Sequence, residues 1–413
     1  MKKKQVVITG TGLVSCFGSD PKKFYEQLLL GKSGVKTITG FDASSQPTTF
    51  AAEVSGFSVD GYMEKKQARR ADAFIHYAMV AGKNAFQDAR LENVTPQRIG
   101  AIIGSGMGGM QAFYDGSIAV RDHGYRRLTP FFVPSIVTNM AGGMLAIECG
   151  FFGPNYSIST ACATGNNCLL AALETIQLGK ADVMLAGSSE AAINPIGMAG
   201  FMSMRALSTS NAAPEKASKP WDQARDGFVM GEGAGVLVLE EKEHAEKRGA
   251  TIYAEFLGGS ANGDAYHITQ PRPGGEVVME CMKSALESAH IHPEDVNYIN
   301  AHATSTPVGD LCELRAIREL FKGNANHILI NSTKSMIGHC LGAAGSLEAI
   351  ATIMAMRTNQ IHPTLNLEHP DEEVADLNLC MGKKRSHVVS AALSNSFGFG
   401  GNNCCLVFAP YVA

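Results

Sequence analysis

One cysteine of the chain stands where a nucleophile could work. Residues 157–167 read Ser-Ile-Ser-Thr-Ala-Cys-Ala-Thr-Gly-Asn-Asn, which predicts a short strand, a tight turn and the start of a buried helix. Cys162 falls at the turn, among small residues that let a substrate approach. The positive end of the helix dipole and free backbone N–H groups favour the thiolate there. A buried, inert cysteine is the alternative interpretation of this stretch alone.

Two histidines and a lysine, His302, Lys334 and His339, follow other predicted strands. Because sites in α/β sheets gather at the carboxyl ends of strands, we expect these side chains to meet Cys162. Each histidine taken singly is more often a structural residue. A cysteine with two histidines is suited to acyl transfer followed by chemistry on an enolate, since neutral imidazoles can donate N–H bonds to a thioester oxygen. The glycine-rich stretch around Phe399 could supply a backbone N–H to the same oxyanion.

Strand and helix patterns alternate along the chain and predict an α/β fold. We expect buried strands near residues 5–12, 98–103, 182–187, 236–239, 298–299, 328–330, 390–393 and 404–408. We expect helices near residues 24–30, 73–90, 240–249, 276–289, 310–321 and 346–356, and a glycine-rich loop leading to Phe201. Similar βα units in residues 1–250 and 251–413 indicate an internal duplication.

Composition places the chain among globular proteins. It has 413 residues, 45% of them hydrophobic and 18% charged, with a formal net charge of -4, which gives no global attraction to nucleic acid or anionic membranes. No apolar run is long enough to span a bilayer, and Met1-Lys-Lys-Lys leads directly into a strand without a signal or transit segment. Ten cysteines without a C-x-x-C pair indicate free thiols in a reducing compartment.

A compact basic run holds Lys65, Lys66, Arg69 and Arg70. On a helix these residues form two i,i+4 pairs of like charge on one face, an arrangement that is mildly destabilising. Such a face suggests an acidic partner, with a merely solvated surface as the alternative.

Residues 104–109 match the dinucleotide pattern G-x-G-x-x-G after a predicted strand. The match stands alone, and Asp122, at about the required distance, does not follow a convincing strand. The pattern therefore favours a glycine turn that packs closely against another site.

Taken together, the motifs resemble those of the β-ketoacyl-[acyl-carrier-protein] synthases of the elongating I/II class, most like type II and plastid-type members. The similarity covers essentially the whole chain, and its motifs are Ser159-Thr-Ala-Cys162-Ala-Thr, the run from Trp221 to Gly235, Asn300-Ala-His302-Ala-Thr-Ser-Thr, Lys334-Ser-Met-Ile-Gly-His339 and Asn395-Ser-Phe-Gly-Phe-Gly-Gly. The resemblance implies a thiolase-like five-layer αβαβα sandwich of two similar halves and a homodimer. Residues 1–250 would carry the cysteine, and residues 251–413 the histidines and the lysine.

The activity implied is the decarboxylating Claisen condensation of acyl-ACP with malonyl-ACP to β-ketoacyl-ACP in fatty acid elongation, with ACP the acyl carrier protein. Cys162 would take the acyl chain, and its N–H with that of Phe399 would form the oxyanion hole. His302 and His339 would promote decarboxylation and stabilise the enolate. The resemblance implies no metal or other cofactor.

Further roles follow from the same resemblance. Lys334 and Glu348 would hold the charge network of the site. The substrate would contact Thr304, Thr306, Met107, Phe201 and Glu348. The carrier protein would dock on Lys65, Lys66, Arg69, Arg70 and Arg205. The resemblance implies neither nucleic acid nor membrane as a partner, and a location in the cytoplasm, or in the plastid stroma if a transit peptide has been removed.

Three alternatives stay open. A polyketide-type ketosynthase would use the same triad. A non-catalytic partner resembling a chain-length factor would lack the nucleophile, which Cys162 argues against. A thiolase would place a second cysteine in the C-terminal glycine-rich loop, whereas Cys404 and Cys405 lie beyond it, and a starter-type enzyme would have Asn in place of His339.

Overall fold

The computed structural model describes residues 3–91, 94–374 and 376–412. The strands of its main sheet are β1 (Val6–Val14), β4 (Ile99–Gly104), β5 (Asn155–Tyr156), β6 (Val183–Glu190), β7 (Gly233–Glu241), β8 (Ala254–Gly263), β9 (Tyr298–Asn300), β10 (Leu329–Asn331), β12 (Asn378–Leu379), β14 (Ala392–Gly398) and β15 (Asn402–Ala409). Within the described residues they form one continuous sheet in the order β12-β10-β9-β14-β15-β8-β1-β7-β6-β4-β5. Two small pairs, β2 (Lys36–Thr37) with β3 (Phe50–Ala51) and β11 (Gln360–Ile361) with β13 (Arg385–Ser386), lie apart from it.

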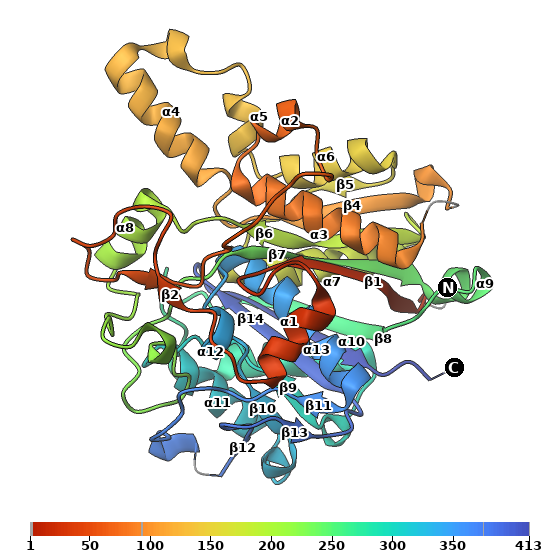
Figure 1. Cartoon of the computed structure of the whole chain (residues 1–413). Coiled ribbons are helices and arrows are strands. Elements are labelled where there is room, and N and C mark those ends of the chain that lie inside the picture. Colours follow the sequence, from red (N-terminus) through yellow and green to blue (C-terminus); the bar gives the residue numbers. More distant parts are fainter. Residues whose placement is uncertain (1–2, 92–93, 375, 413) are drawn as a thin grey trace.

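The helices are α1 (Pro21–Leu29), α2 (Lys65–Ala68), α3 (Ala73–Ala89), α4 (Met110–His123), α5 (Phe132–Ile136), α6 (Met140–Cys149), α7 (Thr164–Gln177), α8 (Pro195–Ser203), α9 (Lys242–Lys247), α10 (Glu276–Ala289), α11 (Gly309–Leu320), α12 (Lys334–Ile337) and α13 (Ala344–Thr358). Helices α3 and α6 cover the outer face of the first half of the sheet, and α10 covers the other outer face with α11 packed against it (Figure 1). Helices α7 and α13 lie between the two halves of the sheet (Figure 1). The described elements therefore stack in five layers, αβαβα.

The central layer explains the composition of its helices. In α13 every residue from Ala344 to Met356 is buried, so the helix has no solvated face. Strand β7 is likewise buried at every position, because helices cover both of its faces.

The strand order repeats within the chain. Strands β1-β7-β6-β4-β5 pair antiparallel, antiparallel, parallel and parallel, and β8-β15-β14-β9-β10 pair in the same sequence. The two sets join where β1 pairs antiparallel with β8 over three residues. The second run of strands begins at β8; the division into halves after residue 250 stays a prediction.

Two stretches differ from the sequence-based expectation. The glycine-rich segment before Phe201 is the helix α8 rather than a loop, because Asn194 caps it by accepting the N–H of Gly197 and Pro195 occupies its first turn. The basic run forms only the single helical turn α2, which ends at Ala68.

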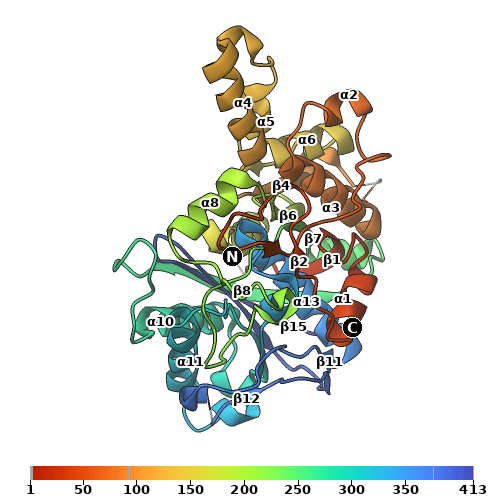
Figure 2. The same ribbon diagram turned by 60° about the vertical axis from the view of Figure 1, so that its left-hand side comes forward.

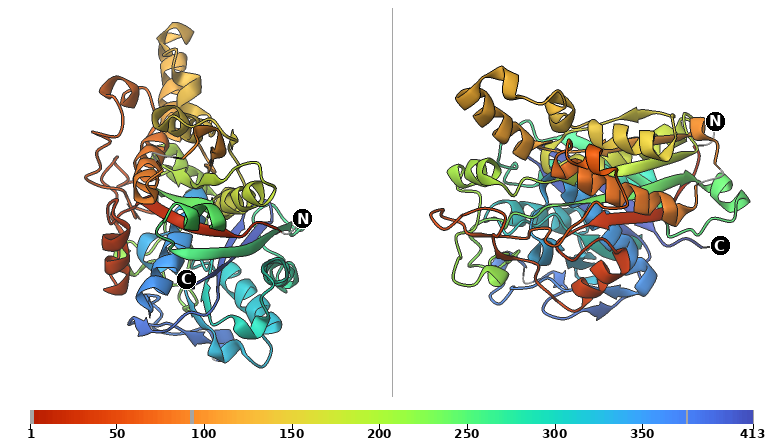
Figure 3. Two further views of the ribbon diagram at one scale, coloured as in Figure 1. Left: turned by 90° about the vertical axis from the view of Figure 1, so that its right-hand side faces the viewer. Right: turned by 45° about the horizontal axis from the view of Figure 1, so that its top comes forward.

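One part of the molecule stands out from the layers. Helix α4 and the segment that follows it project from the body in every view of the ribbon (Figures 1, 2 and 3). Of the residues in α4 only Gly116 is buried, while Phe113 is 56% exposed. None of the helices in the described ranges is both long and apolar enough to cross a bilayer.

The central helices touch through glycines at their first turns. A Cβ on Gly165 would lie 2.6 Å from the amide nitrogen of Ser346, and a Cβ on Gly345 would lie 2.5 Å from Oδ1 of Asn166. Any larger residue would force the helix starts apart. We therefore expect Gly165→Ala to lower the free energy of unfolding by about 1–3 kcal/mol, measured by denaturant titration.

The matched control for that variant is Gly200→Ala in α8. A Cβ there meets no atom within 4 Å, so the variant should gain up to about 1 kcal/mol, because alanine is the better helix former. Equal stability of Gly165→Ala and the wild type would show that the helix starts are not held by this close approach.

Candidate active site

The nucleophile candidate sits on a strained turn. Cys162 is the middle residue of the 3-10 turn Ala161–Ala163, which leads directly into α7. Ala161 has φ = 49°, a left-handed conformation that costs an alanine about 1–2 kcal/mol. The side chain of Thr164 supports the turn, because its Oγ1 accepts the N–H of Thr160 and donates to the carbonyl of Ala161.

The structure brings Cys162 and both predicted histidines together. His339 Nε2 lies 2.9 Å from the Cys162 sulfur, and the His302 and His339 rings lie 5.3 Å apart, nearly perpendicular. His302 follows β9, and its backbone N–H donates to Glu313; the N–H of His339 donates to the carbonyl of Val229. Backbone anchors on both sides therefore fix the two imidazoles against one sulfur.

Electrostatics keep this centre uncharged at rest. Burial raises the pKa of the Cys162 thiol to about 12, although the charge of Lys334 and the backbone N–H of Phe399 oppose it. Burial, followed by the charge of Lys334, holds the pKa of both His302 and His339 well below the usual value of 6.5. The backbone N–H groups at the helix start lower the pKa of the thiol, as the sequence predicts, but desolvation outweighs them in the resting site.

A buried ion pair lies behind the imidazoles. Lys334 Nζ donates to Oε1 of Glu348 over 2.5 Å, and both side chains are 1% exposed. Neither residue is among those that line the cavity around Cys162. Glu348 was expected to contact substrate; in the structure it contacts Lys334 instead, so the pair acts on the site through its charge.

The reactive groups open into one cavity of about 370 Å³. Among the residues that line it are Cys162, His302, His339, Thr304, Thr306, Phe201, Phe399 and Arg205. Thr304 and Thr306 hydrogen-bond through their hydroxyls at 3.1 Å, and the Phe201 and Phe399 rings lie 6.4 Å apart. A thioester could thus reach the cysteine between two hydroxyls and two aromatic rings.

Other predicted site residues lie outside this cavity. Met107 is 41% exposed in the turn after β4 and does not line it. The exposed side chains of Lys65, Lys66 and Arg69 lie elsewhere on the surface, and Arg70 stacks over the ring of Phe131, 3.9 Å from its centroid.

The glycine turn after β4 does not offer a phosphate site. The N–H groups of Gly106 and Met107 both donate to the carboxylate of Glu190, and that of Gly108 donates to Ser105. These donors are already used, so the dinucleotide interpretation is wrong and the glycine turn packs against another part of the site.

One contributor was not predicted from the sequence. Glu313 is buried on α11 and accepts the N–H groups of His302 and Ala303 and the side-chain amide of Asn395. The sequence does hold one sign of this role: Glu313 falls among the apolar residues of its helix, beside Leu314. A glutamate at such a position needs hydrogen-bond partners inside the protein.

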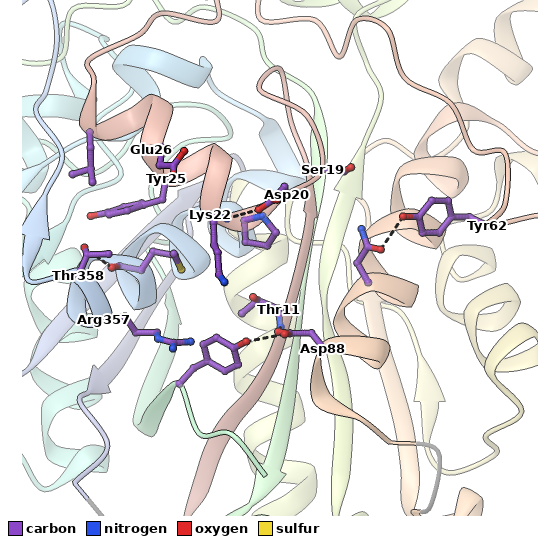
Figure 4. Close-up of a pocket in the computed structure, with 15 residues that line it drawn as sticks. Thr11, Ser19, Asp20, Lys22, Tyr25, Glu26, Tyr62, Asp88, Arg357 and Thr358 are labelled. Atoms are coloured by element: carbon purple, nitrogen blue, oxygen red, sulfur yellow. Dashed lines mark hydrogen bonds between the residues drawn. The ribbon is translucent and has the colours of Figure 1, made fainter.

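A larger cavity of about 730 Å³ lies between α1, α3 and the end of α13 (Figure 4). Its polar groups largely satisfy one another: Asp88 accepts from Tyr253 and from the N–H of Thr11, and Arg357 stacks over the Tyr253 ring. No cysteine or histidine is among the described residues that line it. The nucleophilic chemistry therefore belongs to the smaller cavity.

With this geometry, comparison with known proteins defines the class. The chain matches the family models "Beta-ketoacyl synthase, N-terminal domain" over residues 3–245 and "Beta-ketoacyl synthase, C-terminal domain" over residues 253–368. It belongs to the β-ketoacyl synthase family, and its fold is the thiolase-like sandwich of that family.

Individual proteins of this family resemble the chain over nearly its whole length. The chain is 54% identical to the chloroplastic 3-oxoacyl-[acyl-carrier-protein] synthase I of Hordeum vulgare, over 99% of this chain and 90% of that protein. It is 48% identical to 3-oxoacyl-[acyl-carrier-protein] synthase 2 of Coxiella burnetii, over 99% of both chains. Among solved structures, a β-ketoacyl synthase from Burkholderia phymatum superposes with a TM-score of 0.92 at 34% identity, over 99% of this chain and 100% of that one. A type II polyketide ketosynthase in complex with its acyl-carrier protein also scores 0.92, at 32% identity over all of both chains.

The neutral site leads to a spectroscopic prediction. Because burial and Lys334 lower the pKa values of His302 and His339, neither imidazole should take up a proton between pH 8 and pH 6. Nitrogen NMR of ¹⁵N-histidine-labelled protein, assigned with single His→Gln variants, measures this directly. A titration midpoint near 6.5 for either residue would contradict the electrostatic account.

Proposed function

We propose that the chain elongates fatty acids by condensing acyl-ACP with malonyl-ACP to β-ketoacyl-ACP, with release of carbon dioxide. The observation that supports this most directly is the 2.9 Å approach of His339 Nε2 to the Cys162 sulfur, which also receives the backbone N–H of Phe399. The names of the relatives agree, since they are 3-oxoacyl-[acyl-carrier-protein] synthases.

In the first half-reaction the Cys162 sulfur attacks the thioester carbonyl of acyl-ACP. Its proton passes to the thiolate of the departing carrier arm as the old carbon–sulfur bond breaks, and the arm leaves as a thiol. The N–H groups of Cys162 and Phe399, which both lower the pKa of the thiol, would stabilise the oxyanion. A thiol that stays protonated at rest resists side reactions until substrate arrives.

In the second half-reaction malonyl-ACP occupies the same cavity. Loss of carbon dioxide leaves an enolate, whose oxygen accepts N–H bonds from the neutral imidazoles of His302 and His339. The enolate carbon attacks the acyl-Cys162 carbonyl, and the thiolate leaves. The nearby charge of Lys334, fixed by Glu348, keeps both imidazoles neutral and stabilises the departing thiolate.

We assign the remaining cavity residues to the substrate arm. Thr304 and Thr306 are placed to hydrogen-bond the pantetheine amides, and Phe201 and Phe399 to border the acyl chain. Met107, exposed on a single chain, would line the acyl tunnel once a second subunit covers it.

We further propose that two copies of the chain form a homodimer, and that each copy consists of two similar halves, residues 1–250 and residues 251–413. Strand β5 ends the sheet with one neighbour, β4, among the described strands. The chain from residue 113 to the end of β5 also carries exposed apolar side chains. They are Phe113, Val133, Ile147, Phe152 and Tyr156. A second copy paired along this edge would cover them. The compartment we propose is the cytoplasm or the plastid stroma.

The nucleophile assignment predicts a clear loss. Cys162→Ala should reduce acyl transfer from acyl-ACP by at least about 10³-fold, followed by intact mass. Malonyl-ACP decarboxylation should persist, because it uses the histidines. Cys168→Ala, which removes another buried thiol of the same segment, is the control and should still gain the mass of one acyl group. An acyl adduct on the Cys162→Ala protein would exclude this assignment.

The docking assignment predicts a change in affinity rather than in turnover. The basic run and Arg205, which lies at the cavity, would attract an acidic carrier protein. Reversing charge at Lys65 and Arg69 should raise the KM for acyl-ACP by about 5- to 10-fold with kcat within about twofold. The same reversal at the exposed Lys383 and Lys384 should leave KM unchanged; equal KM values for both variants would mean that the basic run is only solvated.

A further inference from the structure

Strand β6 ends in a buried carboxylate with an unusual set of partners. Glu190 is 0% exposed. Its Oε1 accepts the hydroxyl of Ser105 at 2.9 Å and the N–H of Met107 at 3.0 Å. Its Oε2 accepts the N–H of Gly106 at 2.9 Å and that of Gly342 at 3.0 Å. Glu190, which belongs to the first half of the chain, thus binds the turn after β4 in its own half and the turn at Gly342 in the second half.

The segments around this carboxylate are packed without spare room. A Cβ on Gly342 would lie 2.5 Å from Oε2 of Glu190 and 2.6 Å from the amide nitrogen of Gly106. A Cβ on Gly106 would lie 2.8 Å from Oε2 and 3.6 Å from the carbonyl oxygen of Ala161. The turn of Cys162, the turn after β4 and the turn of Gly342 therefore meet at Glu190.

The turn at Gly342 corresponds, in the internal repeat, to the turn at Cys162. The 3-10 turn Leu341–Ala343 leads into α13 as Ala161–Ala163 leads into α7, and Leu341 has φ = 48° where Ala161 has 49°. Gly342 thus occupies the place of Cys162. At the end of β14 the N–H of Phe399 is directed at Cys162; at the end of β6, the matching strand, Glu190 is directed at Gly342.

We propose that Glu190 is a positioning residue for the condensation, an inference that rests on the proposed function. By holding the N–H of Gly342, it fixes the turn that begins two residues after His339. By holding Gly106 and Met107, it fixes the turn that abuts Ala161. Glu190 in this way sets the distance between His339 and the sulfur of Cys162.

The substitution Glu190→Gln tests the bonding directly. An amide has one acceptor oxygen, so its NH₂ group must face either the N–H of Met107 or the N–H groups of Gly106 and Gly342, and a donor then faces a donor. We expect kcat for acyl transfer to fall by about 10-fold or more, as small misplacements do, while KM for acyl-ACP stays within twofold. Ser105→Ala removes the hydroxyl donor to Glu190 together with the acceptor of the Gly108 N–H in the same turn, and it should give the same pattern with about a threefold loss.

The pH profile distinguishes positioning from general stability. Burial raises the pKa of Glu190 to about 7 against the pull of its hydrogen bonds, and the neutral acid has an O–H where an acceptor is required. The wild-type rate should therefore decline as pH falls through about 7, and this decline should become shallower in Glu190→Gln. Cys162 and His339 do not titrate there, because the pKa of Cys162 is about 12 and that of His339 lies well below 6.5. Burial also raises the pKa of Glu348, the partner of Lys334, to about 7, so its share of the decline should remain in the variant.

Glu232→Gln is the matched control. Glu232 is also buried with a pKa of about 7, but its side chain accepts from Val54 and Tyr77 instead. This variant should keep kcat within twofold and retain the decline near pH 7. Wild-type kcat in Glu190→Gln, or losses in both variants that track their melting temperatures, would overturn the proposal.

A readout without the carrier protein separates this inference from the proposed function. Alkylation of Cys162 by iodoacetamide at pH 8 should slow severalfold in Glu190→Gln and Ser105→Ala but not in Glu232→Gln, because His339 no longer faces the sulfur. Unchanged alkylation in both test variants would refute the positioning role. Slowed alkylation with a wild type that accepts no acyl group would instead refute the proposed function.

Discussion

The close contact between the first turns of α7 and α13 is the constraint on which the site depends. These helices belong to different halves of the chain, yet Gly165 touches the backbone of Ser346 and Gly345 touches Asn166. Each helix start carries a turn at the edge of the cavity, so this contact brings Cys162 within 2.9 Å of His339. Small residues at the helix starts therefore allow the two halves of the site to approach each other.

Burial then decides the charge state of the centre. Desolvation alone would make a thiol and two imidazoles neutral, and the charge of Lys334 reinforces this for both His302 and His339 while it favours the thiolate of Cys162. The ammonium group of Lys334, held by Glu348, thus favours the charged form of the thiol and the neutral form of both imidazoles. Neutral imidazoles can donate to an enolate oxygen at any pH at which the protein would work.

The two halves share one strand order but have diverged where they meet. The turn at Ala161–Ala163 carries Cys162, whose thiolate is favoured by the N–H of Phe399, the residue that follows β14. The turn at Leu341–Ala343 carries a glycine and receives a carboxylate from the end of β6. A repeated scaffold can hold an asymmetric site because the matching strand ends present different groups to the two turns.

The sequence by itself determined the reactive groups and most of the framework. Cys162, His302 and His339 could be identified because their motifs follow strand patterns, and a helix such as α10 follows from apolar periodicity. Helix α8 was missed although Asn194 and Pro195 signal its start, because glycines around it favoured a loop.

Only the tertiary structure decided how those groups behave. The state of Cys162 could not be predicted, because desolvation depends on what covers a residue and not on its neighbours along the chain. The parts played by Glu313 and Glu190 also arise from contacts between distant segments, with Gly342 lying 152 residues from Glu190. Sequence patterns report local geometry, whereas burial and long-range hydrogen bonds exist only once the layers have assembled.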